Sequence, residues 1–186
     1  QSNIVGTFNL LEAIRANWAN MSEKKRNIFR FLHVSTDEVF GSLGSNGFFS
    51  EDSAYDPRSP YSASKAASDH FVKAYFHTYN LPIIITNCSN NYGPWQYPEK
   101  LIPVIILNGI NHLDIPLYGD GEYIRDWIFV EDHVQALFCI LKNGKIGNRY
   151  CIGGTNEYTN NQIASSICDI LDVVDHTYKS HKRLIK

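Results

Sequence analysis

The sequence predicts an α/β protein whose main part is a Rossmann-like, doubly wound parallel sheet, followed by a smaller α+β portion. Helical and strand-like segments alternate over the first half of the chain, and the strand-like segments are continuously apolar, as buried parallel strands are. Polar loops follow these segments directly. Ligands collect beyond the carboxyl ends of such strands, so a site is expected at these loops.

Size and composition are those of a folded globular protein. The chain has 186 residues, of which 44% are hydrophobic and 13% aromatic. Seventeen basic and 19 acidic residues give a formal charge of -2, which provides no general attraction to nucleic acid or to a membrane surface. No segment has the roughly 20 apolar residues that a membrane-spanning helix needs. A partner must therefore be recognised by a defined site.

The cysteines are scattered, with no Cys-x-x-Cys pair and no zinc-type spacing, at positions 88, 139, 151 and 168. This spacing predicts no metal site and favours a reducing cytoplasm. The chain starts at Gln1, without a methionine, in the approach to a helix, and its basic end from Lys179 has no stop signal. We therefore expect a piece of a longer protein.

The first predicted helix spans residues 3–18, because apolar side chains recur there at every third or fourth position. A charged turn follows at 23–26. The segment 28–34 is short, apolar and rich in branched and aromatic residues, which predicts a buried strand. This strand runs directly into Ser35-Thr36-Asp37-Glu38, so an acidic pair follows its carboxyl end.

Residues 41–60 are dense in Gly, Ser, Asp and Pro and predict a surface loop, which Ser59-Pro60 closes at the start of a helix over 60–79. A second buried strand is expected at 81–86, with a polar loop at 87–94.

Beyond residue 95 the pattern is looser. It predicts helices near 100–109, 131–142 and 159–171, and short strands at 115–118, 127–130 and 148–152. We expect residues 1–95 to form one portion and 96–186 to form mainly a second, with a return of the chain to the first portion left open.

Tyr61 and Lys65 are candidates for acid-base chemistry, because residues four apart share a helix face and a nearby ammonium favours an ionised phenol. An ionised tyrosine can take a proton from an alcohol while a hydride leaves for a nicotinamide. The resulting ketone acidifies the neighbouring carbon, where Glu38 could remove a proton while Asp37 protonates a departing hydroxyl. A Tyr–Lys pair or an Asp–Glu pair alone is more often structural than catalytic. Here both pairs precede the next predicted strand, so they could share one pocket. His33 is expected to be a packed histidine.

Several motifs together resemble the extended short-chain dehydrogenase/reductase superfamily, within it the nucleotide-sugar 4,6-dehydratases, and most of all the dTDP-glucose 4,6-dehydratases. The resemblance covers nearly the whole chain. The motifs are Asn3 to Thr7, Ser35 to Gly41, Tyr61 to Lys65, Ser89 to Pro94, Pro98 to Pro103, Arg125 to Trp127 and Val130 to Asp132.

The resemblance implies that Tyr61 oxidises C4 of the sugar with NAD+ as acceptor, that Thr36 lies near that oxygen, and that Asp37 and Glu38 expel water across C5 and C6. The net reaction is that of a hydro-lyase. Implied cofactor-binding residues are Ser2, Ser35, Tyr61, Lys65 and Asn91. Implied substrate-binding residues are Thr36, Asn90, Lys100, Leu101, Pro116, Leu117, Tyr118, Arg125 and Asn160. The resemblance also implies a homodimer through the helices at 3–18 and 60–79.

Two departures from the family pattern matter. Phe40 stands where tyrosine is more usual, and no Gly-x-x-Gly-x-x-Gly turn directly follows a predicted strand. Since that turn cradles the NAD pyrophosphate, we expect the glycine-rich amino-terminal half of the cofactor domain to be missing and NAD binding to be weak. A UDP-glucose 4,6-dehydratase, or another nucleotide-sugar dehydratase or epimerase, stays open as an alternative. So does a catalytically inactive fragment or binding module.

Overall fold

The computed structural model describes residues 1–43, 47–178 and 180–186, and these residues form two compact units. The first unit comprises Gln1–Ser89 and His133–Ile152, and the second comprises Asn90–Asp132 and Gly153–Lys186. Residues 44–46 of the predicted 41–60 loop, and Lys179 at the start of the predicted basic tail, lie outside the described residues. The α/β class with a parallel sheet is confirmed.

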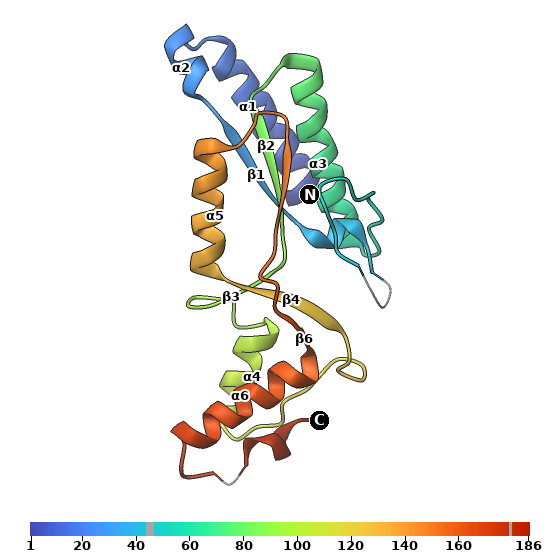
Figure 1. The fold of residues 1–186 in the computed structure, drawn as a ribbon, viewed down its shortest axis with the longest axis vertical. Helices are drawn as coiled ribbons and strands as arrows, with labels where there is room; N and C mark the ends of the chain where they lie inside the picture. Colours follow the sequence, from blue (N-terminus) through green and yellow to red (C-terminus); the bar gives the residue numbers. More distant parts are fainter. Residues whose placement is uncertain (44–46, 179) are drawn as a thin grey trace. The chain divides into compact units, whose positions relative to one another are not determined.

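The first unit is a three-stranded parallel sheet with helices on it, in the order β1-β2-β5. Figure 1 shows α1 and α3 side by side, with α5 on the other side of the strands. The elements are η1 (Ser2–Gly6, a π-helical turn), α1 (Thr7–Ala19), α2 (Glu23–Ile28), β1 (Phe31–Thr36), η2 (Asp37–Phe40, a 3-10 turn), α3 (Pro60–Tyr79), β2 (Ile83–Cys88), α5 (Val130–Asn143) and β5 (Arg149–Ile152).

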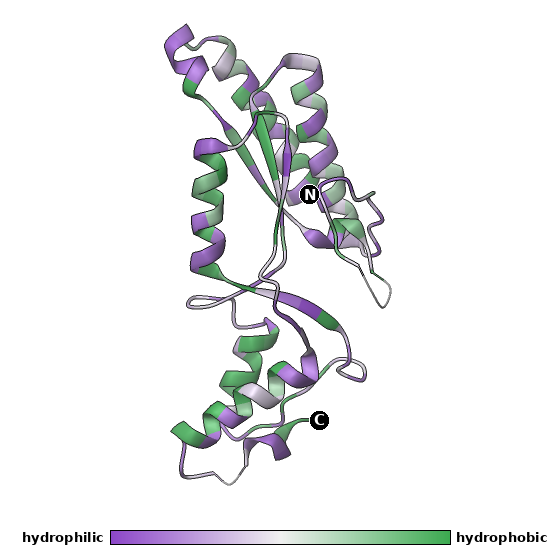
Figure 2. Ribbon diagram, viewed as in Figure 1, coloured by the Kyte–Doolittle hydropathy of each residue, from purple (hydrophilic) through white to green (hydrophobic). Residues whose placement is uncertain are grey.

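The core of the first unit lies between this sheet and α1 with α3. Strand β2 is the middle strand, and its first five residues are buried, which explains its continuously apolar start (Figure 2). The fully or almost fully buried side chains are Leu11, Val72, Tyr75, Leu81, Ile83 and Ile85.

The second unit is a small α+β assembly in which β4 is the middle strand, parallel to β3 and antiparallel to β6. Its core lies between α4 and α6 and contains Ile105, Ile115, Ala164, Cys168 and Leu184. The elements are β3 (Asn90–Tyr92), α4 (Leu101–Ile110), β4 (Ile124–Phe129), β6 (Glu157–Thr159), α6 (Asn160–Val174) and η3 (His181–Leu184).

The start of β1 and the segment 115–118 differ from the sequence-based expectation, which also did not include the short strands β3 and β6. The charged turn at 23–26 is part of the short helix α2. This helix ends at Ile28, a residue that was expected in the strand, and β1 starts only at Phe31. The expected strand at 115–118 is only an isolated bridge between Ile115 and Ile185. None of the described helices is both long and apolar enough to cross a membrane.

Candidate active site

The acidic pair lies at the carboxyl end of β1, where Thr36 ends the strand and caps the turn η2. The Thr36 hydroxyl accepts a hydrogen bond from the Glu38 backbone N–H at 3.2 Å and donates one to Asp37 Oδ1, also at 3.2 Å. A Thr at this capping position satisfies an N–H that a turn would otherwise leave unpaired. Thr36 thereby holds the Asp37 carboxylate and the Glu38 backbone, and both acidic side chains are partly exposed.

The rest of η2 anchors the pair to the helix that carries Tyr61. Val39 and Phe40 are 0% and 4% exposed and pack with Ala66 of α3. Phe40 also packs on Phe49 and Tyr55. Because the Phe40 ring is buried among aromatic side chains, the hydroxyl of the usual tyrosine is not needed to hold this turn.

Helix α3 starts at a well-defined point, which places Tyr61 in its first turn. Ser59 accepts a hydrogen bond from the Ser62 N–H, and Ser62 accepts one from the Ser59 N–H, both at 3.0 Å. Pro60 adds a fixed φ at the first helical position. The Tyr61 side chain remains 51% exposed, so its hydroxyl is open to a ligand.

The electrostatics of Tyr61 differ from the sequence-based expectation. Burial of part of the ring raises the pKa of the phenol above its usual value, and the charges of Glu38, Cys88 and Asp37 raise it further. Lys65 instead donates a hydrogen bond to the Val34 carbonyl at 2.8 Å. This direction of the Tyr61 pKa runs against the expectation that Lys65 favours an ionised phenol, and burial is its first cause.

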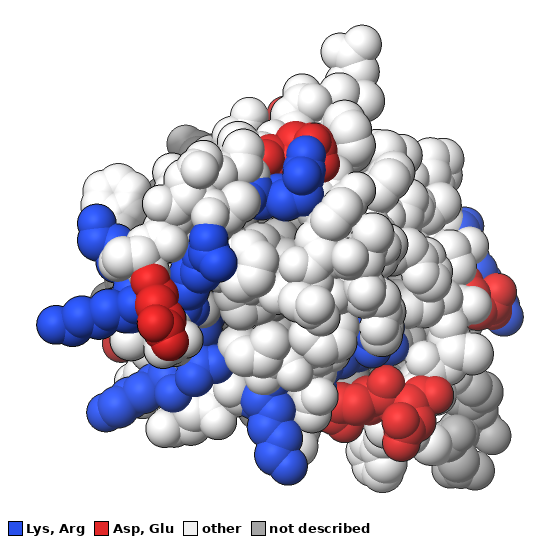
Figure 3. Space-filling view, turned by 90° about the horizontal axis from the view of Figure 1, so that it is seen from above, with Lys and Arg blue, Asp and Glu red and all other residues white. Residues whose placement is uncertain are grey.

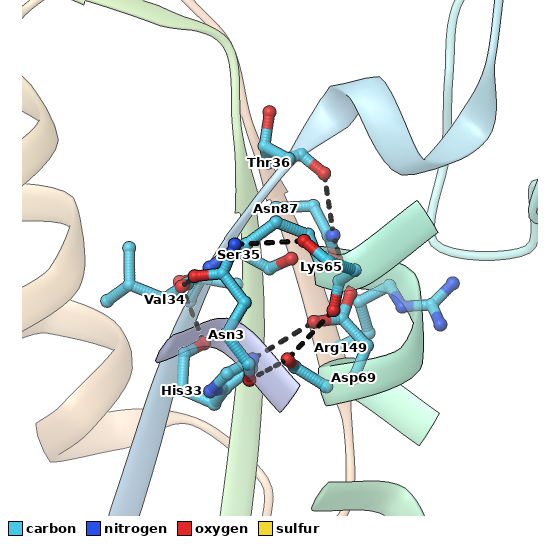
Figure 4. A network of polar contacts seen from close by, with 12 residues as sticks. Asn3, His33, Val34, Ser35, Thr36, Lys65, Asp69, Asn87 and Arg149 are labelled. Carbon is cyan, nitrogen blue, oxygen red and sulfur yellow. Dashed lines mark hydrogen bonds and ion pairs between the residues drawn. The ribbon is translucent and has the colours of Figure 1, made fainter. Parts of the chain in front are cut away.

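A buried polar network supports the end of β1 from below (Figure 4). Asp69 of α3 has a side chain with no exposed surface and accepts hydrogen bonds from His33 at 3.0 Å, Tyr55 at 3.0 Å and Asn87 at 3.2 Å. Asn87 also donates to the Thr36 carbonyl at 2.9 Å. Burial acts to raise the pKa of Asp69, but the hydrogen bonds, led by that from His33, outweigh it and lower the pKa. Asp69 is therefore an ionised anchor.

The remaining predicted cofactor residues of the first unit lie close to α3. Ser35 is buried in β1 directly before Thr36. Ser2 begins η1, where the neighbouring Asn3 donates a hydrogen bond to Ser64 at 2.9 Å, next to Lys65. The first unit thus brings together Ser2, Ser35, Thr36, Asp37, Glu38, Tyr61 and Lys65.

All other predicted site residues belong to the second unit, and four of them lie on or beside its small sheet. Asn90 and Asn91 are in β3, and Asn90 is the register partner of Trp127 in β4. Arg125 of β4 is exposed and pairs in register with Tyr158 of β6. Asn160 begins α6, and its N–H donates to the Tyr123 carbonyl at 3.3 Å.

The other five predicted residues lie around α4. Lys100 is the exposed residue that precedes α4, and Leu101 is the first residue of this helix. Leu117 packs against the core of the second unit, whereas the flanking Pro116 and Tyr118 are exposed.

The sequence did not point to the residues under the site. Asp69, Asn87, Tyr55 and Arg149 form this support, and Arg149 lies over the rings of Phe40 and Tyr55. The spacing of Tyr61, Lys65 and Asp69 at intervals of four was the available signal, because it puts all three near one helix face.

A second concave surface of the first unit lies at the other end of β1. This groove is lined by Met21, Lys25, Ile28, Phe29, Arg30, Leu141 and Lys142. Figure 3, which looks onto the end that carries α2, shows Lys and Arg side chains along one side of this face. Arg30 of this groove directly precedes β1, and Thr36 ends β1, so about 20 Å of strand lies between them.

Similar proteins occur in several bacteria. A dTDP-glucose 4,6-dehydratase of Neisseria meningitidis serogroup B is 56% identical over 173 residues, which are 92% of this chain and 49% of that protein. The dTDP-glucose 4,6-dehydratase 1 of Escherichia coli K12 is 50% identical over 194 aligned positions, covering the whole chain and 54% of the relative. The chain thus spans about half the length of these relatives.

Solved structures show the same relationship. The crystal structure of a Bacillus anthracis dTDP-glucose 4,6-dehydratase in complex with NAD has a TM-score of 0.86 at 44% identity, over 99% of this chain and 54% of that one. A UDP-glucuronic acid 4-epimerase of Bacillus cereus has a TM-score of 0.79 at 26% identity, over 96% of this chain and 52% of that one. Over its full length, residues 1–186, the chain matches the family described as GDP-mannose 4,6 dehydratase. The chain therefore belongs to the GDP-mannose 4,6 dehydratase family.

Proposed function

We propose that the protein containing this chain dehydrates dTDP-glucose to dTDP-4-keto-6-deoxyglucose. The observation that carries the proposal is the acidic pair Asp37-Glu38, fixed by Thr36 and anchored on the helix of Tyr61. Oxidation and reduction at C4 alone need no second acid and base, whereas elimination of water needs both. The names of relatives about 50% identical to the chain support the same reaction.

Each group has a defined task in this proposal. Tyr61 takes the proton of the C4 hydroxyl, and Thr36 hydrogen-bonds the same oxygen. Glu38 removes the C5 proton, and Asp37 protonates the C6 hydroxyl, which departs as water. Bound NAD would accept the C4 hydride and return it to C6, while Glu38 would return the proton to C5, so that no net oxidation occurs.

The chain fits one end of this cofactor. An exposed phenol and an ammonium on one face of α3, beside Ser35, suit a ribose and a nicotinamide, and we assign Ser2, Ser35, Tyr61, Lys65 and Asn91 to NAD. The Gly-x-x-Gly-x-x-Gly spacing occurs at positions 41, 44 and 47, which follow the turn η2 and not a strand, so the sequence has no glycine-rich turn that leads directly from a strand into a helix. We assign the pyrophosphate cradle to a glycine-rich half of the cofactor domain outside this chain. Within the chain, we assign residues 1–95 to a catalytic portion and residues 96–186 to a portion that mainly binds the substrate.

The nucleotide sugar is assigned to Thr36 and to residues of the second unit. Exposed Arg125 and Lys100 provide positive charge for a diphosphate, and Arg can bind two phosphate oxygens at once. The other proposed contacts are Asn90, Leu101, Pro116, Leu117, Tyr118 and Asn160. UDP-glucose is the competing substrate, and parallel assays with both nucleotide sugars distinguish the two.

A homodimer through η1 with α1 and through α3 is part of the proposal. Apolar side chains remain exposed here, with Val5 and Leu10 each 51% exposed and Phe8 42%. Such a patch is typical of an interface. We expect Leu10→Glu to convert a dimer into a monomer in sedimentation; a monomeric unmodified protein would contradict the interface.

Four free cysteines favour a cytoplasmic location.

The decisive experiment replaces Glu38 with Gln in the full-length protein. The variant should lose at least about 100-fold in dehydration, the usual scale for a general base, and should not exchange the C5 hydrogen with deuterated water. Glu23→Gln on the exposed surface of α2 is the matched control and should keep full activity. Dehydration by Glu38→Gln at the unmodified rate would refute the assignment.

A catalytically inactive binding module is the second candidate, favoured by the missing glycine turn. Equilibrium NAD binding separates the two interpretations when the 186-residue chain is compared with the full-length protein. We expect at least tenfold tighter binding by the longer chain, because it would supply the pyrophosphate cradle. Equal, weak binding by both would favour the inactive module.

A further inference from the structure

Three potential metal ligands converge in the second unit, far along the chain from the acid-base groups Asp37, Glu38 and Tyr61. His112 follows α4, Asp175 follows α6 and His181 begins η3. One ligand atom from each lies within 4.8 Å of the other two. Asp175 Oδ2 is 2.9 Å from His112 Nε2 and 3.7 Å from His181 Nε2. The spacing along the sequence gives no sign of this cluster.

The tautomer of His181 follows from its partner Asp172. His181 Nδ1 lies 2.5 Å from Asp172 Oδ1, and the His181 backbone N–H donates to the same oxygen at 2.7 Å. The backbone N–H can only donate, so Asp172 Oδ1 acts as an acceptor at this position. His181 Nδ1 therefore carries the proton, and in the neutral ring Nε2 presents a lone pair.

That lone pair is buried and lacks a hydrogen-bond partner. The His181 side chain has no exposed surface, and its Nε2 makes no hydrogen bond. It faces Asp175 Oδ2 at 3.7 Å, so two electron-pair donors point at each other across a gap. An imidazolium would close this gap to about 2.8 Å through an N–H···O bond. A cation between the two atoms satisfies both.

The other two ligands are also held in place. Thr177 donates from its N–H at 2.9 Å and its hydroxyl at 2.6 Å to Asp175 Oδ1, which leaves Oδ2 for the cluster. The His112 ring stacks on Tyr178, with ring centres 4.4 Å apart and planes 14° from parallel. His112 and Asp175 are 37% and 24% exposed, so the cluster is open to solvent.

We propose that His112, Asp175 and His181 bind a divalent first-row metal ion of the Zn²⁺ class. Two imidazoles and one carboxylate form a donor set that favours such ions over Ca²⁺ and Mg²⁺. A carboxylate on the far nitrogen of a ligand histidine, here Asp172, is the usual outer-sphere partner. Tetrahedral bonds of about 2.0–2.1 Å hold ligand atoms about 3.3 Å apart, so the 2.9 Å separation between His112 and Asp175 would widen and the 3.7 Å separation between His181 and Asp175 would shorten. The ion would tie the end of α4 to the end of α6.

Titration of metal-free full-length protein with Co²⁺ and Zn²⁺ tests the proposal. One equivalent of Co²⁺ should give visible absorption bands, and Zn²⁺ should displace it. His112→Gln and Asp175→Asn should weaken binding at least about 100-fold, since each removes one of three ligands. Asp172→Asn, which keeps all three ligands, should weaken it about 10- to 100-fold.

The matched control is His176→Gln, an exposed histidine next to Asp175. It should leave Co²⁺ affinity and Zn²⁺-induced thermal stabilisation unchanged, whereas His112→Gln abolishes both. His112 is on the surface, so its replacement tests the site even where a His181 variant fails to fold. Absence of one-equivalent Co²⁺ binding by the unmodified protein, or equal weakening by His176→Gln, would overturn the proposal in favour of a metal-free ion-pair network.

Discussion

At the scale of single residues, the stability of the acidic pair depends on the buried carboxylate of Asp69. Asp69→Asn removes a charge that accepts three side-chain hydrogen bonds, so we expect a loss of about 3 kcal/mol in the free energy of unfolding. Urea unfolding at pH 7 measures it. Exposed Asp52→Asn is the control and should change this free energy by less than about 0.5 kcal/mol.

The same variant has a pH signature. The pKa of Asp69 is lower in the folded than in the unfolded chain, so the unfolded state binds more protons as the pH falls. The stabilisation by the carboxylate is complete above the ordinary pKa of 3.8 and is lost as the pH falls through the lower folded value. The difference between unmodified protein and Asp69→Asn should therefore shrink only as the pH falls below 3.8. A constant difference would contradict the ionised anchor.

The candidate residues themselves could be read from the sequence, but their electrostatics could not. The four-residue spacing of Tyr61 and Lys65 correctly places both on α3. The pKa of Tyr61 is raised first by burial and then by Glu38, Cys88 and Asp37, which other elements bring close. Such long-range geometry has no local signature.

At the scale of elements, the turn after η2 depends on Gly41. Its φ is +88°, and a Cβ there would lie 2.5 Å from the Asp56 carbonyl oxygen, which is backbone and cannot move aside easily. We expect Gly41→Ala to destabilise the fold by about 2 kcal/mol, through both strain and the clash. Thermal unfolding measures it.

Gly6→Ala is the matched control for this substitution. Gly6 has a helical φ of -62°, and a methyl group added at its Cα would meet open space, so alanine should be neutral or stabilise by up to about 1 kcal/mol. Equal destabilisation by both substitutions would show that the Gly41 turn is not specially constrained.

Long periodic elements were predictable because their own residues determine them. Helix α3 begins and ends as expected, since Ser59, Pro60 and the apolar period define it locally. Strands β3 and β6 were not expected, because each has three residues and Asn90 and Asn91 have low strand propensity. Pairing with β4, not local preference, makes them strands.

At the scale of the whole molecule, the two units have separate hydrophobic cores. Ile83 belongs to the core of the first unit and Ile105 to that of the second, and both are fully buried. The chain enters the second unit after Ser89, returns to the first at His133 and leaves it again after Ile152. This return depends on strand pairing of β5 with β2 and had no signal in composition.

Separate cores predict separate local unfolding. Ile105→Ala should cost about 3 kcal/mol, through lost burial and the cavity left behind, and should speed amide hydrogen exchange in α4 and α6. Exchange in β1 and β2 should change little. Ile83→Ala is the reciprocal variant and should reverse the pattern. If either substitution accelerates exchange equally in all four elements, the two cores unfold together as one cooperative block. The two units would then have no independent stability.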